Sequence, residues 1–514
     1  KINVKSSSYK KYIVVFIGSL FLMVVGCSSD NQKLLSSSNL IGEKPSIENH
    51  IKIEDIQANN YTLDELIQHG EHVFVAILNT LDGKGRPAST GGGAKREPRI
   101  FPDNLNRISG PDSDSCAGCH NRPSVGGGGD NAANVFVLAQ FEQFVDFSKQ
   151  EHVVKGLEGI GNERNTLGMF GSGFIELLAR EMTDDLQLQK KQAVEKAIKE
   201  GILIEENLLT KNISFGKIRV TPFGKVDYSD VEGIDHDLVV KPFHQKGVVE
   251  SLRVFTNAAM NHHHGIQPTE IFGENTDADG DGVINELTMG DVTALTIFQA
   301  TLPAPHQVWP KDTHLKSMAK KGENLFSSIA CTSCHVPKLP LENTIFSEPG
   351  PHNRYPNLSC SGTLKHKKRL SENTSDKTVG TQCKENGPCY CSESNIEAPY
   401  NFDLLPFIKN FTRDEDGRLL VPVFTDLKRH AMGQQLNNEE REQADVPTDQ
   451  WLTKKLWGFY SEPSYLHHGR ASLISEAILA HGGESQSSRD MFASLSDEDK
   501  NSLIEYLKTF VINK

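Results

Sequence analysis

Hydrophobic residues repeat with helical spacing in three parts of the chain. Steps of three, four and seven place most members of each set on one face of a helix. The first set precedes residue 116 and contains Leu63, Leu66, Ile67, Phe74 and Ile77. The second precedes residue 331 and contains Leu315, Met318, Leu325 and Phe326. The third ends at a Leu-Pro-Ala-Pro segment, residues 302–305, and contains Val292, Leu295, Ile297 and Phe298.

Alternating patterns typical of strands are sparse. The best candidate is segment 214–222, where apolar residues alternate around Phe215, Ile218 and Val220. We therefore predict a mainly α fold with long irregular loops and little β structure. A chain of 514 residues allows two or three domains. The two prolines at 303 and 305 mark the boundary between an N-terminal domain, 61–305, and a C-terminal domain, 306–514.

Two Cys-x-x-Cys-His motifs follow the first two predicted helices. This pentapeptide attaches a c-type haem, because two cysteines three apart reach both porphyrin vinyl groups and the next histidine becomes the proximal iron ligand. A zinc site is the alternative, but neither motif has a second ligand pair at finger spacing. The sequence predicts two covalent haem c groups in two cytochrome c-like domains, held by Cys116, Cys119 and His120, and by Cys331, Cys334 and His335.

The N-terminal segment has the pattern of an export signal. Four lysines precede an apolar run, residues 12–25, that is short for a membrane span but suits a signal peptide. The run leads to Gly26 and Cys27, which resemble a bacterial lipobox. We predict a lipoprotein signal peptide, 1–27, with acylated Cys27, against an ordinary signal peptide. Residues 28–60 are expected to be a flexible tether on the periplasmic side, most consistent with the outer membrane.

Four further cysteines fall in a polar segment, about 345–400, that is expected to be an insertion in the C-terminal domain. An even number of cysteines in an exported protein indicates disulfides. Zinc is the alternative, although the spacing lacks a Cys-x-x-Cys pair. The disulfide candidates are Cys360, Cys383, Cys389 and Cys391.

Charge and one acidic loop add two expectations. The net charge of −13 disfavours nucleic acid as a partner. Asp277, Asp279 and Asp281 alternate and are followed by Gly282, a pattern that can wrap oxygen ligands around Ca²⁺. Thr288 stands where an EF-hand has its bidentate Glu, so a plain acidic surface loop is the alternative.

The chain resembles the bacterial dihaem cytochrome c peroxidases and their MauG-type relatives. The resemblance is closest to a dihaem branch described as thiol oxidoreductases, and it covers roughly residues 60–514. The segments that carry it are 449–458, 465–471 and 475–484 in the C-terminal part, with 171–176, 261–265, 281–287, 334–337 and 424–427.

The resemblance implies a division of labour between the two haems. The haem on His335 would take electrons from a small donor protein, of the cytochrome c or cupredoxin type, and pass them to a reactive haem on His120. Peroxide or another small oxidant would react there. His481 stands where the peroxidases have the distal Met, and Met432 and His430 are the alternatives. A histidine that packs in the core or at the helix C-terminus is the other alternative for His481.

The distal side of the first haem has no matching histidine. None lies between residues 121 and 150, where the peroxidases have theirs. Consecutive helix residues point about 100° apart, so at most two of the histidines at 262–264 can face an iron. We expect His263, His264 and the acid Glu176 as catalytic candidates. The alternatives are a polar helix end stopped by Gly265 and a salt-bridged carboxylate.

These observations predict an exported dihaem oxidoreductase, most consistent with a peroxidase-like enzyme. A two-haem electron carrier without its own substrate and a dioxygen-using oxygenase are the alternatives. An open iron distinguishes the enzymes from the carrier. Contact with the membrane is expected only through the lipid anchor.

Overall fold

The computed structural model describes residues 43–85, 113–129, 132–135, 162–277, 279–351, 382–383, 389–390, 399–409, 411–439 and 442–512. Pro45–Lys514 form one unit and Lys1–Lys44 another. The predicted signal peptide with Cys27, and part of the tether, lie outside the described residues. Within these ranges, every helix is either too short or too polar to cross a membrane.

The N-terminal part of the larger unit is built around the pair α3 (Leu63–Val75) and α8 (Met289–Thr301). A capping box between Thr62 and Glu65 starts α3. Gly70 lets the two backbones touch, because a Cβ there would lie 2.1 Å from the Ala294 carbonyl oxygen. The sequence predicts α8 as amphipathic, but residues 290–301 are buried on every face because α3, α5 and α6 surround the helix.

Asp291 in the first turn of α8 binds residues of the N-terminal segment and of α3. Its carboxylate contacts His50 Nδ1 at 2.6 Å and His69 Nε2 at 2.8 Å, and it accepts from the Ile51 amide at 3.0 Å. Burial alone would raise the pKa of Asp291, but these hydrogen bonds hold it well below its usual range. The buried carboxylate therefore joins the segment before α2 (Ile53–Gln57) to α3 and α8.

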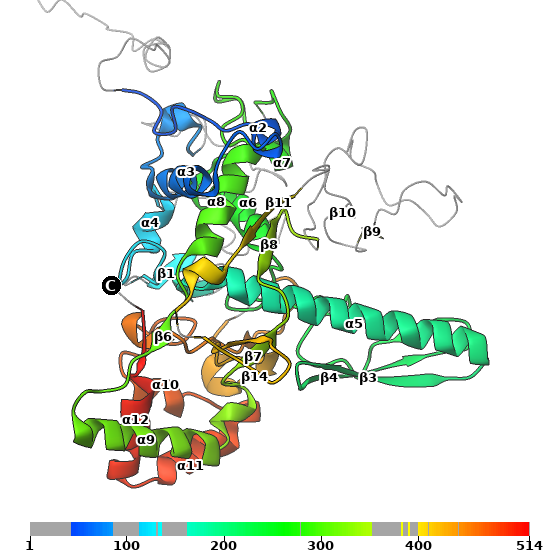
Figure 1. Cartoon of the computed structure of the whole chain (residues 1–514), viewed down its shortest axis with the longest axis vertical. Coiled ribbons are helices and arrows are strands. Elements are labelled where there is room, and N and C mark those ends of the chain that lie inside the picture. The colour runs from blue at the N-terminus through cyan, green and yellow to red at the C-terminus, as the bar shows by residue number, and fades with distance from the viewer. Residues whose placement is uncertain are drawn as a thin grey trace, which may run out of the picture. The chain divides into compact units, whose positions relative to one another are not determined.

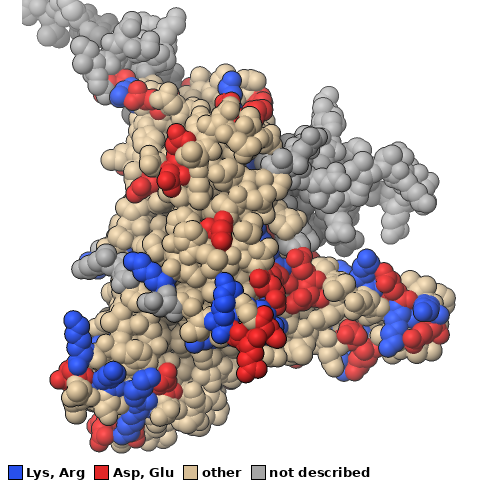
Figure 2. All heavy atoms as spheres, in the orientation of Figure 1, with Lys and Arg blue, Asp and Glu red and all other residues tan. Residues whose placement is uncertain are grey.

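The longest helix, α5 (Ser172–Glu200), runs beside a small antiparallel sheet of β3 (Ile204–Thr210), β4 (Ile213–Val220) and β5 (Val226–Asp227) (Figure 1). The strand predicted at 214–222 is β4, and its alternate residues Ile213, Phe215, Ile218 and Val220 are buried. Figure 2 shows acidic and basic side chains interspersed over α5 and this sheet. Lys217 and Arg219, for example, both pair with Glu205.

A second helical group forms around the second haem motif. Helix α9 (Thr313–Ser328) packs on α12 (Asp497–Leu507), where Gly322 lies against the Ser502 carbonyl. The shorter helices α10 (Ile474–Leu479) and α11 (Gln486–Ser494) precede α12. An aromatic core includes Phe326, Phe424, Phe492, Tyr506 and Phe510.

Short strand pairs connect distant segments. The pairs are β1 (Ala132–Val135) with β2 (Asn162–Asn165), β6 (His306–Gln307) with β16 (Phe510–Val511), β8 (Ile345–Glu348) with β11 (Tyr400–Asp403), β9 (Gln382–Cys383) with β10 (Cys389–Tyr390), and β14 (Arg429–Ala431) with β15 (Gln450–Leu452). A three-stranded sheet orders β12 (Thr412–Arg413), β13 (Leu419–Val421) and β7 (Leu339–Leu341). All are antiparallel.

The predicted fold class is wrong. Among the described residues, helical segments make up 39% and strands 16%, and these residues do not show two cytochrome c domains. Strands of two to four residues are too short for an alternating pattern to be visible in the sequence. They are held by pairing with distant segments, as β6 is by β16, and a local pattern does not record such partners. The domain boundary at 305 and 306 stays a prediction.

The Cys-rich segment is described only in part. Its ends pair as β8 and β11, with Glu348 opposite Tyr400. Within it, β9 and β10 place Cys383 opposite Cys389 along the backbone. Cys360, Cys391 and the side chains of Cys383 and Cys389 lie outside the described residues, so the disulfides stay predictions.

Candidate functional site

The first motif forms one helical turn, α4 (Cys116–Cys119), whose N-cap Ser115 accepts from the Gly118 amide at 3.0 Å. Both cysteines are free thiols. Burial raises the pKa of Cys116 to about 12 and also raises that of Cys119. Protonated thiols are poor nucleophiles and poor metal ligands. Two protonated thiols in the wall of a cavity are compatible with thioether attachment.

His120 is oriented by a glycine loop. Its Nδ1–H donates to the Gly127 carbonyl at 3.2 Å, which leaves Nε2 as the nitrogen available to a metal. The loop needs glycine at this point, because a Cβ on Gly127 would lie 1.7 Å from the Arg122 carbonyl oxygen. Burial lowers the pKa of His120 to about 4, so the imidazole is neutral at pH 7. A neutral, oriented imidazole is what proximal ligation of haem iron requires.

A cavity of about 430 Å³ lies in front of the first motif. Cys116, Cys119 and His120 form part of its wall, and a large share of the remaining wall is apolar. The apolar lining includes Phe74, Met169, Ile175, Phe255 and Leu295. A mostly apolar cavity with the attachment cysteines and a ligand histidine in one wall fits a haem.

Three consecutive histidines line the cavity from a π-helical turn, η5 (Met260–His264), that continues α6 (Leu252–Ala259). Gly265 ends the turn with a φ of +77°. The α-helical spacing of 100° predicts at most two of His262, His263 and His264 on one side. The π turn has more residues per turn and brings all three to the cavity. His244 joins them from another loop.

The predicted catalytic residues occupy different positions. His264 donates from Nδ1 to the Ser113 carbonyl at 2.8 Å, and its Nε2 lies 3.8 Å from Cys116 Sγ. Burial lowers the pKa of His264 to about 4. Glu176 is absent from the cavity wall: its carboxylate pairs with Arg180 and accepts from the Leu252 amide at 2.8 Å. The bond to Leu252 stabilises the first turn of α6. A catalytic role for Glu176 stays a prediction.

One part of the cavity wall is cationic. Arg164, Lys454 and Lys455 line it, and no Asp or Glu is among its described lining residues. Lys455 Nζ donates to the Gly168 carbonyl at 2.8 Å, and burial lowers the pKa of Lys455 to about 8. Buried Glu462 lies nearby and accepts from the Gly128 amide at 3.0 Å. Sequence reasoning missed this wall, although a Lys pair within an apolar segment is unusual enough to be a signal.

The second motif begins at η6 (Cys331–Ser333), directly after α9. Burial raises the pKa of Cys331 to about 12. His335 Nδ1–H donates to the Phe424 carbonyl at 3.1 Å, and burial lowers the pKa of His335 to about 4. The arrangement repeats that of His120, with one ring nitrogen fixed by a backbone carbonyl and the other available to a metal.

His481 lies opposite His335. Their ring centres are 6.5 Å apart, and His481 Nδ1–H donates to the Ala477 carbonyl at 2.8 Å. Metal–imidazole bonds of about 2 Å place the ring centres of two opposite ligands roughly 6 Å apart. The spacing therefore fits one iron between the two rings. Met432 is half-buried, with its sulfur 4.0 Å from Ser485 Oγ.

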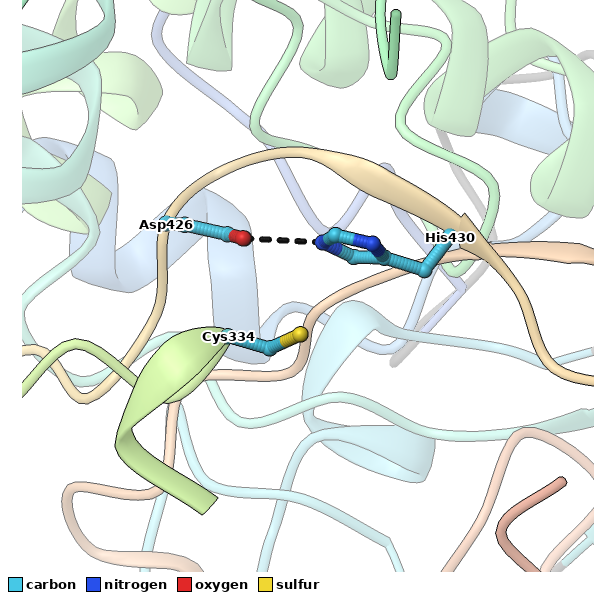
Figure 3. A group of neighbouring side chains, drawn as sticks. All are labelled: Cys334, Asp426 and His430. Atoms are coloured by element: carbon cyan, nitrogen blue, oxygen red, sulfur yellow. Dashed lines mark hydrogen bonds and ion pairs between the residues drawn. The ribbon is translucent and has the colours of Figure 1, made fainter. Parts of the chain in front are cut away.

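Beside this pair, Cys334, Asp426 and His430 form a cluster whose possible ligand atoms lie within 4.8 Å of one another (Figure 3). His430 Nε2 bonds Asp426 at 2.8 Å and Nδ1 bonds Glu484 at 2.7 Å. Burial opposes protonation of His430, but hydrogen bonds to Asp426, Cys334 and Glu484 raise its pKa to about 11. Both nitrogens of this imidazolium are engaged, so the geometry disfavours His430 as a metal ligand.

The acidic loop brings Asp277, Asp279 and Asp281 together within 4.8 Å at the surface. Asp277 already accepts from the Gly280 amide at 2.7 Å and from the Gly282 amide at 3.0 Å. These bonds shape the loop, and calcium binding stays a prediction.

Comparison with known proteins gives one match. Residues 409–510 match the family described as "Di-haem oxidoreductase, putative peroxidase". No curated protein and no solved structure matches the chain. The matched segment contains Asp426, His430 and His481. The match covers about a fifth of the chain, and in that segment the chain is similar to the dihaem peroxidase-like superfamily.

Proposed function

We propose that this chain is a peroxidase-type dihaem oxidoreductase that passes electrons from a haem at His335 to a reactive haem at His120. The observation that carries the proposal is the difference between the two histidines. His335 has a second imidazole at ligand distance, His481, whereas His120 faces a cavity of about 430 Å³. A six-coordinate iron suits electron transfer, and a small oxidant needs an open iron.

The residues fit two covalently attached c-type haems. Cys116 and Cys119, and Cys331 and Cys334, are free thiols next to the two oriented histidines. Bound haem would supply one-electron chemistry at both sites and a binding position for the oxidant at the open one. The Nδ1 bonds of His120 and His335 fix the tautomer and the ring orientation of each ligand.

The cavity histidines can move protons. Reduction of peroxide to water consumes two electrons and two protons. His264 is neutral, with its proton on Nδ1 and its Nε2 lone pair beside Cys116, at the attachment edge of the cavity. His263 lies between His262 and His264 in the π turn and also lines the cavity. We assign proton transfer to His263, because the bond to the Ser113 carbonyl holds His264 at the attachment edge of the cavity.

The cationic wall can orient the cofactor. A haem carries two carboxylate groups, and these need positive partners when they enter an enclosed site. Lys454 and Lys455 line the same cavity as the first motif, and the one buried carboxylate described beside them, Glu462, does not line it. They would hold the carboxylate edge of the haem and shield it from repulsion with Glu462.

Electron paramagnetic resonance of the purified holoprotein tests the proposal. We expect one low-spin haem and one haem that is at least partly high-spin, together with peroxide-dependent oxidation of a reduced small cytochrome. Two haems that stay low-spin in both oxidation states would overturn the enzyme assignment in favour of an electron carrier. Activity with dioxygen but not peroxide would favour an oxygenase.

We also propose an exported, lipid-anchored location on the periplasmic side, with a small redox protein as the electron donor. The lipobox-like sequence at Cys27 supports the anchor. Membrane fractionation of Cys27→Ser tests it: the variant should move to the soluble exported fraction. Retention in the membrane would indicate another attachment.

A further inference from the structure

The segment after His481 is docked tightly against the end of β14. Gly483 has no room for a side chain, because a Cβ there would lie 2.1 Å from the Ala431 carbonyl oxygen. Gly482 is also tight, because a Cβ there would lie 3.0 Å from the Met432 carbonyl oxygen. Gly483 also has a φ of +52°, which favours glycine. The backbone that follows His481 is therefore fixed by contact with residues 431–433.

Glu484 strengthens this contact with both of its oxygens. Oε1 accepts from the Ala431 amide at 2.8 Å, and Oε2 bonds His430 Nδ1 at 2.7 Å. The carboxylate comes from η11 (Gly483–Ser485), three residues after His481. It reaches across to β14 while its side chain is still 54% exposed to solvent.

The other side of His430 leads to the proximal histidine. His430 Nε2 bonds Asp426 Oδ2 at 2.8 Å, and Asp426 is buried (Figure 3). Asp426 lies two residues after Phe424, whose carbonyl accepts from His335 Nδ1. One continuous set of contacts thus runs from the segment that orients His335, through Asp426, His430 and Glu484, to the segment that carries His481.

We propose that His430 is a positioning residue for the His335 haem: the Asp426–His430–Glu484 clasp holds His481 opposite His335 and so keeps that iron six-coordinate. The inference rests on the proposed function, because it needs His481 as the distal ligand. His430 acts through the backbone of residues 482–484 and not as a ligand, since both of its ring nitrogens are engaged by carboxylates. Its role is to keep small molecules off the electron-transfer haem.

The test removes the contacts that Glu484 makes with His430 and with the Ala431 amide. In Glu484→Ala holoprotein, part of the low-spin signal of the His335 haem should convert to high-spin, and the reduced protein should bind carbon monoxide at both haems. Haem content by pyridine haemochrome should stay at two per chain. His430→Gln should show the same change, and Glu484→Gln, which can still accept from the Ala431 amide, should show a smaller one.

Asp490→Ala is the matched control. Asp490 is also an exposed carboxylate after His481, 59% exposed, but its bonds go to Gln486 and Arg489 within its own helix. This variant should keep the wild-type spectrum and bind carbon monoxide at one haem.

His481→Ala separates failure of the clasp from failure of the ligand assignment. If His481→Ala loses the low-spin signal while Glu484→Ala and His430→Gln keep it, the clasp is overturned and the ligand stands. If His481→Ala itself keeps the low-spin signal, His481 is not the distal ligand, and both the clasp and this part of the proposed function are wrong.

Discussion

The imidazole ring centres of His335 and His481 lie 6.5 Å apart, and each ring has its Nδ1 bonded to a backbone carbonyl. These bonds place the proton of each neutral ring on Nδ1 and leave Nε2 as the nitrogen that can bind a metal. Pre-orientation of both ligands reduces the conformational entropy lost when they bind a metal.

Replacing His481 by alanine should change the electronic state of one haem and leave its attachment intact. The His335 iron should lose its second imidazole and convert from low-spin to high-spin. Its reduction potential should rise, because a second imidazole stabilises the ferric state relative to weaker distal ligands. Electron paramagnetic resonance and a spectroelectrochemical titration measure the two effects. Met432→Leu is the companion variant, and a larger change there would assign the distal position to Met432.

Removing the first pair of cysteines should remove one haem. Cys116→Ala combined with Cys119→Ala should leave one covalent haem per chain by pyridine haemochrome assay, because the two motifs lie in separate segments. Cys331→Ala with Cys334→Ala should likewise leave one haem, at the other site. Loss of both haems or of neither would contradict one attachment site per motif.

Replacing Lys454 should lower the potential of the haem at His120. Positive charge beside an iron stabilises its reduced form, so Lys454→Gln should cost that form on the order of 1 kcal/mol. The shift is measured by spectroelectrochemical titration. Lys191→Gln, a change at a lysine 72% exposed on α5, is the control and should leave the potential unchanged. An unshifted potential in Lys454→Gln would place the lysine away from the cofactor.

Stability should be greatest between the ordinary pKa values of Asp and His. The pKa of Asp291 is held below 3.8, so its contribution is present above that value and is lost as the pH falls through the lower folded value. Burial alone would lower the pKa of His50, but its bond to Asp291 raises it above 6.5. That contribution is present below 6.5 and is lost as the pH rises through the raised value.

Asp291→Asn tests this pH dependence. It should destabilise the protein by about 3 kcal/mol, because a buried group loses its charged partner, and it should flatten stability against pH at both ends. Thermal unfolding from pH 3 to pH 9 measures both effects. An unchanged profile would show that other groups set the pH dependence.

The sequence is sufficient to predict the features that depend on neighbours in the chain. The two Cys-x-x-Cys-His motifs and the helices before them, α3 and α9, are visible in local spacing. The Phe424 carbonyl that orients His335 comes from 89 residues away, and only the fold brings it there. The same holds for Glu484, which reaches His430 across 54 residues. Individual hydrogen bonds of this kind leave no periodic pattern in the sequence.

The short strands and the cavity wall escaped prediction for related reasons. Strands such as β14 and β15 have three residues each, fewer than an alternating pattern needs. The sequence predicts an amphipathic α8, but the helix is buried on every face because other helices surround it. His262 to His264 were assigned α-helical geometry, and the π turn changed their directions.

That π turn constrains how the chain can evolve. A π turn in a helix is equivalent to one additional residue in the α-helical ladder. Deleting one residue between Ala259 and Gly265 would restore α-helical geometry and rotate the following side chains by about 100° around the axis. At most two of the three histidines could then face the cavity. A one-residue deletion here would therefore change the histidine-lined wall even if every histidine were retained.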